Sequence, residues 1–454
     1  MSEINEKIFK AYDIRGKYPE EINEETVFKI ARALAIFLKK QYKKNPKIII
    51  SSDNRLSSPS LKKEVISGLK NEGVDIIDIG LNPTPVFYFA VWKLKAAGGI
   101  QITASHNPPQ DNGLKIVREK VIEIGKENWI EEIKDIIRKL DNFKPKKSKS
   151  KIKKDLSILN KFFKFNKKGF NFNFLKGKKI VFDTANSVSG LYIKEIKKIF
   201  PCKILNLFSK LDGSFPNHLP NPIEEKNLEV LKETVKREKA DLGVAFDGDG
   251  DRIVFVSEKG ELIPPDFISS LISKELLKHY PNSKIVYNIC SSNILKETVQ
   301  KYGGKPIVTK IGHIFVKEIM IKENAIFGGE YSGHFFFREH NFCEAPIFVL
   351  FLILKILDNE KKPLSEIISP FKKYFNSGQI NFEIEDKIGK IEKLKEIYKN
   401  GKINTLDGLR IDFPDWWFII RPSNTENLLR LNVEAKSEDI LKEKLEEIKK
   451  ILLS

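Results

Sequence analysis

The sequence predicts an α/β fold in which three tandem, related α/β domains with mixed sheets precede a smaller C-terminal α+β domain. Three observations lead to this prediction. The chain has 454 residues, enough for three or four domains of about 100–150 residues each. One strand–loop–helix pattern occurs three times, and the pattern changes after Pro370.

The repeated pattern begins with a short β-branched run, continues through a loop of Ser, Asn and Asp, and ends in an amphipathic helix. Its three copies cover residues 47–69, 178–200 and 284–302. β-Branched runs favour strands, and the loop residues are good helix N-caps. The repetition indicates three related domains, although any α/β protein repeats strand, loop and helix.

The C-terminal stretch predicts a different arrangement. It contains, in order, an alternating run at 379–385, a helix at 387–400, strands at 405–413, 417–421 and 428–434, and a helix at 438–453. Strands and helices mixed in this way are typical of an α+β domain. The expected domains are residues 1–152, 153–258, 259–368 and 369–454.

The chain is basic, with a formal net charge of +18 that comes from 68 lysines and 11 arginines against 61 acidic residues. The lysines are spread over nearly the whole chain, which favours a solvated surface. The densest run, residues 144–154, has no aromatic residue on which a base could stack. We interpret this run as a linker, with RNA binding as the alternative, and expect no nucleic-acid partner.

No segment predicts membrane insertion or secretion. The longest apolar stretch, residues 345–357, contains Lys355 and is shorter than the roughly 20 residues that span a bilayer. A buried helix is expected there. The N-terminal residues lack the apolar core of a signal peptide, and the three cysteines are too far apart for a disulfide framework or a zinc knuckle. We expect a cytoplasmic monomer or homodimer without a membrane partner.

An acidic turn lies between two apolar runs within residues 242–257. Three carboxylates, from Asp247, Asp249 and Asp251, repel one another strongly unless a cation lies among them. The glycines between them let the backbone curl so that the oxygens converge. Hard oxygen ligands suit Mg²⁺ or Ca²⁺, so the pattern predicts a metal site on a strand–turn–strand.

Two other metal-loop interpretations are open. An EF-hand would add Glu258 as a fourth Ca²⁺ ligand, but Arg252 stands where that motif needs glycine and the flanks are not helical patterns. A phosphatase of the haloacid-dehalogenase type is a stronger rival, because it also has Asp-x-Asp after a strand. Asp247 would then be a nucleophile, and the serine loop described next would have no role.

A second loop follows an apolar run within residues 97–117, which read AGGIQITASHNPPQDNGLKIV. The two prolines prevent a helix from starting directly after the strand. The loop therefore holds Ser105 and His106 at a strand end, where polar side chains can reach a ligand. A hydroxyl beside His106 and within a few residues of Lys115 could accept a phosphoryl group.

The strings TASHNPPQDNGLK and DGDGDR together resemble the α-D-phosphohexomutase superfamily, phosphomannomutase/phosphoglucomutase type. Three more segments carry the resemblance. FKAYDIRG at residues 9–16 is similar to the family's opening motif, GGEYSGHF at 328–335 to its sugar-recognition loop, and RPSNTE at 421–426 to its phosphate-binding loop. The five motifs occur in family order across nearly the whole chain.

The resemblance implies an enzyme that interconverts hexose 1-phosphate and hexose 6-phosphate, of mannose or glucose, through a phosphoserine and a bisphosphorylated sugar. It places the phosphoserine at Ser105 and implies Mg²⁺ held by Ser105 with Asp247, Asp249 and Asp251. A hexose 1,6-bisphosphate would act as activator. The active site would lie in a central cleft between the four domains.

The resemblance also implies further site residues. Besides Ser105, the catalytic residues would be Arg15, Lys115 and His313, with the general acid and general base left open. The substrate-binding residues would be Tyr12, His106, Arg252, Glu330, Ser332, His334, Arg421, Ser423, Asn424 and Thr425. Glu330 and Ser332 would bind sugar hydroxyls, whereas the bidentate fork of Arg421 would bind the phosphate that is not transferred.

Two departures from the family pattern concern the substrate. A Lys-Cys pair is common in the third domain, but here Cys290 follows Asn288 and Ile289 without a lysine, and Asn427 stands where proline is frequent. The opening motif and Asn424 favour mannose and glucose phosphates. A phosphoglucosamine mutase, in which Gln rather than Tyr331 would follow the recognition Glu, is the alternative.

Overall fold

The computed structural model describes residues 4–10, 13–42, 45–125, 129–140, 150–423 and 428–454. The chain forms two compact units, each built from two segments. The first unit comprises Met1–Ile263 and Ser332–Leu364, and the second comprises Pro264–Tyr331 and Ser365–Ser454.

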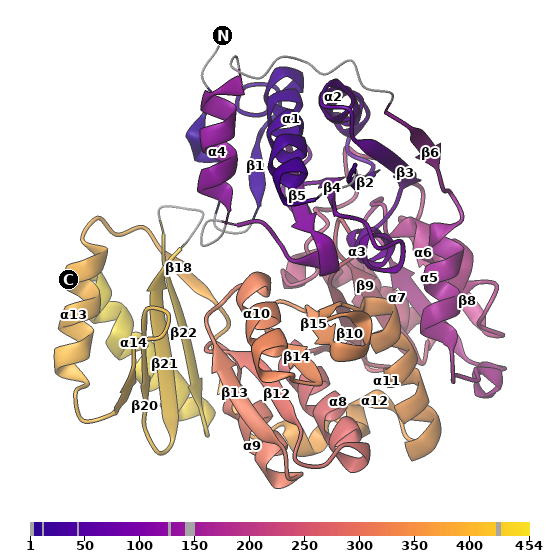
Figure 1. Ribbon diagram of the computed structural model, residues 1–454. Coiled ribbons are helices and arrows are strands. Elements are labelled where there is room, and N and C mark those ends of the chain that lie inside the picture. Colours follow the sequence, from indigo (N-terminus) through magenta and orange to yellow (C-terminus); the bar gives the residue numbers. More distant parts are fainter. Residues whose placement is uncertain (1–3, 11–12, 43–44, 126–128, 141–149, 424–427) are drawn as a thin grey trace. The chain divides into compact units, whose positions relative to one another are not determined.

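The first unit begins with a mixed six-stranded sheet in the order β1-β5-β4-β2-β3-β6 (Figure 1). Pairing is parallel between β2 and β3, β2 and β4, and β3 and β6, whereas β5 runs antiparallel to β4 and β1. The strands are β1 (Ile14–Lys17), β2 (Lys47–Ser52), β3 (Asp75–Leu81), β4 (Gly98–Ile102), β5 (Asp111–Arg118) and β6 (Ile152–Lys154). The helices are α1 (Glu24–Gln41), α2 (Ser58–Asn71), α3 (Thr84–Lys93) and α4 (Ile130–Arg138).

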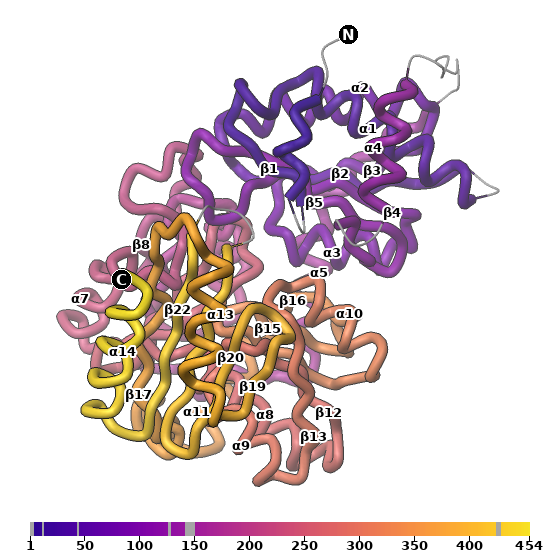
Figure 2. The backbone as a smooth tube through the Cα atoms, turned by 90° about the vertical axis from the view of Figure 1, so that its left-hand side faces the viewer, coloured from indigo at the N-terminus to yellow at the C-terminus, as the bar shows by residue number. Residues whose placement is uncertain are grey.

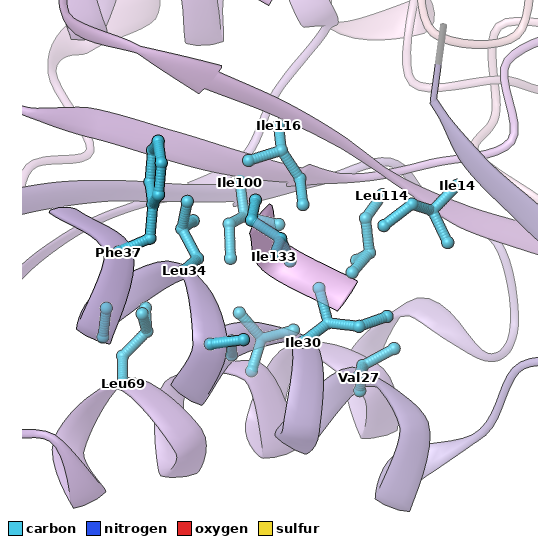
Figure 3. Close-up of a cluster of buried hydrophobic side chains, with 14 of the residues drawn as sticks. Ile14, Val27, Ile30, Leu34, Phe37, Leu69, Ile100, Leu114, Ile116 and Ile133 are labelled. Carbon is cyan, nitrogen blue, oxygen red and sulfur yellow. The ribbon is translucent and has the colours of Figure 1, made fainter. Parts of the chain in front are cut away.

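Helices cover both faces of this sheet. A Cβ on Gly98 would come within 3.3 Å of Leu38 in α1, whereas one on Gly99 would come within 2.5 Å of Phe87 in α3. Successive strand residues point to opposite faces, so α1 and α3 pack on opposite sides. On the α1 side, Leu34 and its apolar neighbours form a closed core with strand residues such as Ile100 (Figure 3).

A second sheet in the same unit has the order β11-β10-β9-β7-β8, with parallel pairing of β7 to β8 and β9. Its strands are β7 (Lys179–Asp183), β8 (Lys203–Leu207), β9 (Leu242–Phe246), β10 (Ile253–Val256) and β11 (Leu262–Ile263). The remaining elements of the unit are α5 (Ile158–Lys167), α6 (Gly190–Ile196), α7 (Glu229–Glu238), β15 (Phe335–Phe337), β16 (Cys343–Glu344) and α11 (Pro346–Glu360). Because β9 and β10 form an antiparallel hairpin, the acidic turn lies at its tip.

The second unit begins with three parallel strands in the order β13-β12-β14. They are β12 (Lys284–Asn288), β13 (Lys305–Thr309) and β14 (Phe327–Gly329), and the helices are α8 (Pro265–His279), α9 (Asn293–Lys301) and α10 (His313–Glu323). The chain passes for the last time from the first unit to the second within α12 (Leu364–Ile367).

An antiparallel sheet completes the second unit, in the order β17-β22-β21-β20-β19, with β18 also paired to β22. Figure 2 labels four of these strands, β17, β22, β20 and β19. The elements are β17 (Phe375–Asn376), β18 (Ile380–Phe382), α13 (Lys387–Ile397), β19 (Lys402–Asn404), β20 (Leu409–Asp412), β21 (Trp416–Pro422), β22 (Leu429–Ala435) and α14 (Glu438–Leu453). Successive side chains of β21 point to opposite faces of the sheet. On one face, Phe418 and Ile420 pack with α13 and α14. On the other face, Trp417 and Ile419 pack against Ile289.

These elements confirm the predicted fold class. Each of the three repeats forms a strand and a helix, and the apolar stretch from residue 346 to 357 lies in the buried helix α11. Among the described residues, no helix combines the length and the apolar character that crossing a membrane requires. The strands β17 and β19 were not predicted, because short exposed segments carry little periodic signal. The four domain boundaries stay predictions.

The core on α1 gives a stability prediction. Leu34 is fully buried, whereas Leu453 is 73% exposed. Leu34→Ala should lower the free energy of unfolding by about 2–5 kcal/mol, because it removes buried apolar atoms and leaves a cavity. Leu453→Ala should change it by less than about 0.5 kcal/mol. Urea unfolding of both variants measures the difference, and equal midpoints would contradict this packing.

Candidate functional site

Ser105 lies in the turn that joins β4 to β5. Its φ of 51° is in the left-handed region, which is uncommon for a residue with a side chain. The backbone N–H of Ser105 donates to Thr103 Oγ1 at 2.9 Å. The hydroxyl, almost fully buried, lies 2.9 Å from Asp247 Oδ2 and 3.3 Å from His106 Nδ1. The strained turn therefore directs the Ser105 hydroxyl at the acidic loop.

The acidic loop folds tightly at the tip of the β9–β10 hairpin. Asp247 Oδ1 accepts hydrogen bonds from the backbone N–H of Asp251 at 3.0 Å and of Arg252 at 3.1 Å. A Cβ at position 248 would lie 2.2 Å from the Ser105 carbonyl oxygen, and Gly250 has a φ of 71°. The first glycine thus permits the close approach of the serine loop, and the second permits the left-handed turn.

The three carboxylates fit a divalent cation. Oxygens of Asp247, Asp249 and Asp251 all lie within 4.8 Å of one another, and all three side chains are buried. Burial, together with the neighbouring Asp251 and Asp249 charges, raises the pKa of Asp247 well above its ordinary value. Asp249 Oδ1 is buried and accepts no hydrogen bond from any residue that the structure describes. A hard cation such as Mg²⁺ satisfies such oxygens and relieves their repulsion.

Residues outside the hairpin fix the loop from two sides. Thr84 at the start of α3 binds Asp249 twice, through its hydroxyl to Oδ2 at 2.6 Å and through its N–H to the carbonyl oxygen at 2.8 Å. Ser187 and Ser189 donate to the Asp247 carbonyl oxygen at 3.2 and 2.8 Å. None of these three residues was predicted. Ser187 and Ser189 bind a backbone carbonyl oxygen, which leaves no mark in the sequence, and Thr84 lies in none of the motifs.

Cationic side chains surround the carboxylates. Lys115 Nζ lies 2.7 Å from Asp249 Oδ2 and 2.5 Å from Asp251 Oδ2. Burial disfavours the charged form of Lys115 and lowers its pKa. The charges of Asp249 and Asp251 outweigh burial, so the pKa of Lys115 lies above its ordinary value. Lys115 is therefore positively charged near neutral pH, in contact with both carboxylates.

Arg15 approaches the serine loop from β1. It pairs with Asp13 at 2.6 Å and donates to Asn107 Oδ1 at 2.8 Å and to the Ala104 carbonyl oxygen at 3.2 Å. Burial lowers the pKa of Arg15, but Asp13 and Asp249 outweigh it, so that the net shift is upward. For His106, burial and then the charges of Arg252 and Arg15 lower the pKa well below its ordinary value, which makes its imidazole neutral.

The predicted sugar-loop residues Ser332 and His334 belong to the same unit as the acidic loop. His334 Nδ1 lies 2.8 Å from the Ser332 hydroxyl, and His334 Nε2 lies 3.3 Å from both Asp251 Oδ1 and Arg252 Nε. The first unit thus brings ten of the predicted site residues together in one cluster around the hairpin tip. Its predicted members are Arg15, Ser105, His106, Lys115, Asp247, Asp249, Asp251, Arg252, Ser332 and His334.

Other predicted residues lie in the second unit. Glu330 is almost fully buried and accepts hydrogen bonds from Asn288 Nδ2 at 3.2 Å and from the Gly312 N–H at 3.3 Å. It therefore faces the start of α10, whose first residue is His313. Arg421 is buried near the end of β21, where it lines a cavity of about 20 Å³ with Cys290 and Tyr331, room for about one water molecule.

Several predictions stay open after this description. Ser423 follows β21 directly and its N–H donates to the Leu428 carbonyl oxygen at 2.8 Å. Tyr12, Asn424 and Thr425 lie outside the described residues. The central cleft between four domains stays a prediction, as do the roles assigned to His313, Glu330 and Arg421. The strands on both sides of the acidic turn contradict an EF-hand, which needs helices there.

A buried serine hydroxyl against a cation-binding carboxylate cluster, flanked by lysine and arginine, is suited to phosphoryl transfer. Comparison with known proteins gives the family. Models of the phosphoglucomutase/phosphomannomutase α/β/α domains I, II and III match residues 6–144, 160–260 and 264–374, and that of the C-terminal domain matches 380–451. The chain belongs to the phosphoglucomutase/phosphomannomutase family, within the α-D-phosphohexomutase superfamily.

Individual relatives agree over their whole length. The chain is 39% identical to a phosphomannomutase of Methanocaldococcus jannaschii, over 98% of this chain and 97% of the relative. It is 35% identical to a phosphomannomutase/phosphoglucomutase of Pseudomonas aeruginosa, over 98% and 94%. A crystal structure of a family protein from Burkholderia thailandensis superposes with a TM-score of 0.90 at 29% identity, covering 99% and 98%. The protein is therefore an enzyme of the phosphohexomutase class.

The metal site gives a direct prediction. Asp249→Asn keeps the side chain's size but removes a charge from the carboxylate cluster, so Mg²⁺ affinity should fall by at least about 10-fold. Asp135→Asn is the matched control, because Asp135 lies on the surface with 60% of its side chain exposed. Isothermal titration with Mg²⁺ measures both variants. An Asp249→Asn protein that binds Mg²⁺ as the control does would remove the metal role.

Proposed function

We propose that this phosphohexomutase carries the phosphoryl group on Ser105 and moves it between the 1- and 6-positions of mannose and glucose phosphates. The contact that supports this most strongly is the 2.9 Å approach of the Ser105 hydroxyl to Asp247 Oδ2. A phosphoryl group on that oxygen would lie beside the cation-binding carboxylates and close to the His106 ring. Ser187 and Ser189, by contrast, donate to the backbone carbonyl oxygen of Asp247 rather than to its carboxylate.

In the proposed reaction, the bond between phosphorus and Ser105 Oγ breaks while a bond to the free hydroxyl of a hexose monophosphate forms. The sugar hydroxyl gives up its proton as the new bond forms, Ser105 Oγ takes up a proton as it leaves, and the sugar becomes a bisphosphate. After the sugar has turned over, its other phosphoryl group returns to Ser105, whose oxygen is again the acceptor. A hexose 1,6-bisphosphate added from outside would act as activator, because it can phosphorylate the resting serine by the same step.

The charged groups around Ser105 suit this transfer. Asp247, Asp249 and Asp251 would hold Mg²⁺ together with a phosphoserine oxygen, and the ion would neutralise charge on the transferred group. Lys115 and Arg15, both positively charged by the shifts described above, would face the phosphoryl oxygens and the sugar hydroxyl. Lys115 is thus better suited to donate a proton to a departing oxygen than to accept one.

Three of the residues that the family motifs assign would bind the sugar and the distal phosphate. Glu330 and Ser332 would accept and donate hydrogen bonds at vicinal sugar hydroxyls, and Arg421 would bind the second phosphate. The names of the full-length relatives support mannose and glucose as substrates. Glucosamine phosphate is the alternative substrate, and the assay must compare its turnover with that of mannose and glucose phosphates.

A substrate panel tests the function. With Mg²⁺ and a hexose bisphosphate, the protein should convert mannose 1-phosphate and glucose 1-phosphate to the 6-phosphates faster than glucosamine 1-phosphate. Ser105→Ala should lose nearly all turnover on every sugar, because no acceptor oxygen remains, yet should fold normally. Coupled assays and circular dichroism measure both. Turnover of the Ser105→Ala protein at the wild-type rate would rule out Ser105 as the carrier.

The role of Glu330 can be tested separately. Glu330→Gln keeps the acceptor for Asn288 and Gly312 but removes the charge that would grip sugar hydroxyls. We expect kcat/KM to fall by roughly 10- to 100-fold on mannose and glucose phosphates alike, the loss of about one charge-assisted hydrogen bond. Glu339→Gln, a change outside the motif, serves as the control. If Glu330→Gln and the control have the same kinetics on all hexose phosphates, another residue recognises the sugar.

A further inference from the structure

One arginine that no motif assigned lies directly behind the serine loop. Arg55 follows β2, and its side chain has no exposed surface. Its guanidinium donates to four backbone carbonyl oxygens of one loop: Nη2 to Ser105 and Asn107, both at 2.7 Å, and Nη1 to Pro108 at 2.6 Å and Asp111 at 2.9 Å. A planar guanidinium can bind converging acceptors in a fixed geometry that an ammonium cannot reproduce.

The contact to the Ser105 carbonyl bears on the reacting side chain. Ser105 adopts a left-handed φ of 51°, a conformation that persists in a residue with a side chain only where the surroundings enforce it. Thr103 Oγ1 holds the N–H of Ser105, and Arg55 holds its carbonyl oxygen. The backbone at Ser105 is therefore fixed at both ends, and the side chain between them points at Asp247.

Arg55 is itself held in place. Asp53 Oδ2 lies 3.2 Å from Arg55 Nε, and Asp53 Oδ1 accepts from the Arg55 N–H at 3.0 Å and from the Ser58 hydroxyl at 2.6 Å. The ring of Phe215 lies 5.1 Å from the guanidinium carbon, within the range of a cation–π contact. The guanidinium is thus set before substrate arrives, as a preorganised support requires.

We propose that Arg55 is a positioning residue for phosphoryl transfer: by binding the carbonyl oxygens of the serine loop, it keeps the Ser105 oxygen aligned with the metal-binding carboxylates. Because the Arg55 side chain is wholly buried, it cannot touch the sugar. Its loss should therefore slow the chemical step and leave substrate affinity unchanged. This inference rests on the proposed role of Ser105 as carrier.

The principal test is Arg55→Lys. The lysine keeps the charge but cannot bind four carbonyls in one plane, so the serine loop should shift. A displacement of about 1 Å at reacting atoms can cost about 100-fold in rate, and we expect kcat to fall by that order while KM and Mg²⁺ affinity stay at their wild-type values. Arg32→Lys is the matched control, since Arg32 also forms an ion pair in the same unit, partly buried, with Glu72 at 2.7 Å.

A second variant covers the case in which Arg55→Lys does not fold. Asp53→Asn keeps the shape of the side chain beside Arg55 but removes the charge that orients the guanidinium. Its kcat should therefore also fall, by less than in Arg55→Lys, with KM unchanged. The proposal is overturned if the soluble variants keep the wild-type kcat, if they lose activity through KM, or if Arg32→Lys loses kcat equally. Ser105→Ala separates the carrier role of Ser105 from the positioning role of Arg55. If Ser105→Ala is active, Ser105 is not the carrier. If Ser105→Ala is inactive but Arg55→Lys keeps the wild-type kcat, only the positioning role is ruled out.

Discussion

Three carboxylates buried within a few ångströms of one another cannot all stay charged unless cations lie among them. Asp247, Asp249 and Asp251 are in that position, and Lys115 already contacts two of them. In the turn between β9 and β10, Gly250 lies where the chain must turn and Gly248 lies where the serine loop comes close. Repulsion within this cluster therefore explains both its demand for a divalent cation and the ring of cationic side chains around it.

The serine loop depends on the same cluster. The Ser105 hydroxyl lies against Asp247, while Gly248 leaves space for the Ser105 carbonyl oxygen. Thr84, Ser187 and Ser189 fix the acidic loop from the neighbouring elements. Two loops far apart in sequence thus hold each other in one arrangement, in which a group on Ser105 would lie beside the cation-binding carboxylates. Phosphoryl transfer needs such positioning and charge neutralisation more than it needs covalent help from the protein.

Much of this could be predicted from sequence, and the rest could not for identifiable reasons. The repeats, the buried helix α11 and the acidic hairpin follow from periodicity and from the spacing of Asp247, Asp249 and Asp251. Family motifs led to Ser105, Arg15 and Lys115, which the structure brings together with the acidic loop. Arg55 could not be found in this way, because its partners are main-chain oxygens, which every residue has. The short strands β17 and β19 were missed because they bury too little to impose a pattern.

The most direct test of the central claim follows the phosphoryl group itself. Wild-type protein that carries ³²P on Ser105 would be mixed with unlabelled mannose 1-phosphate in the presence of Mg²⁺. The reaction would be stopped before one turnover is complete, and the products would be separated. If Ser105 is the carrier, the label should leave the protein and appear first in a bisphosphorylated sugar, then in mannose 6-phosphate. Label that stays on the protein, or that appears only as inorganic phosphate, would contradict a mutase that works through Ser105.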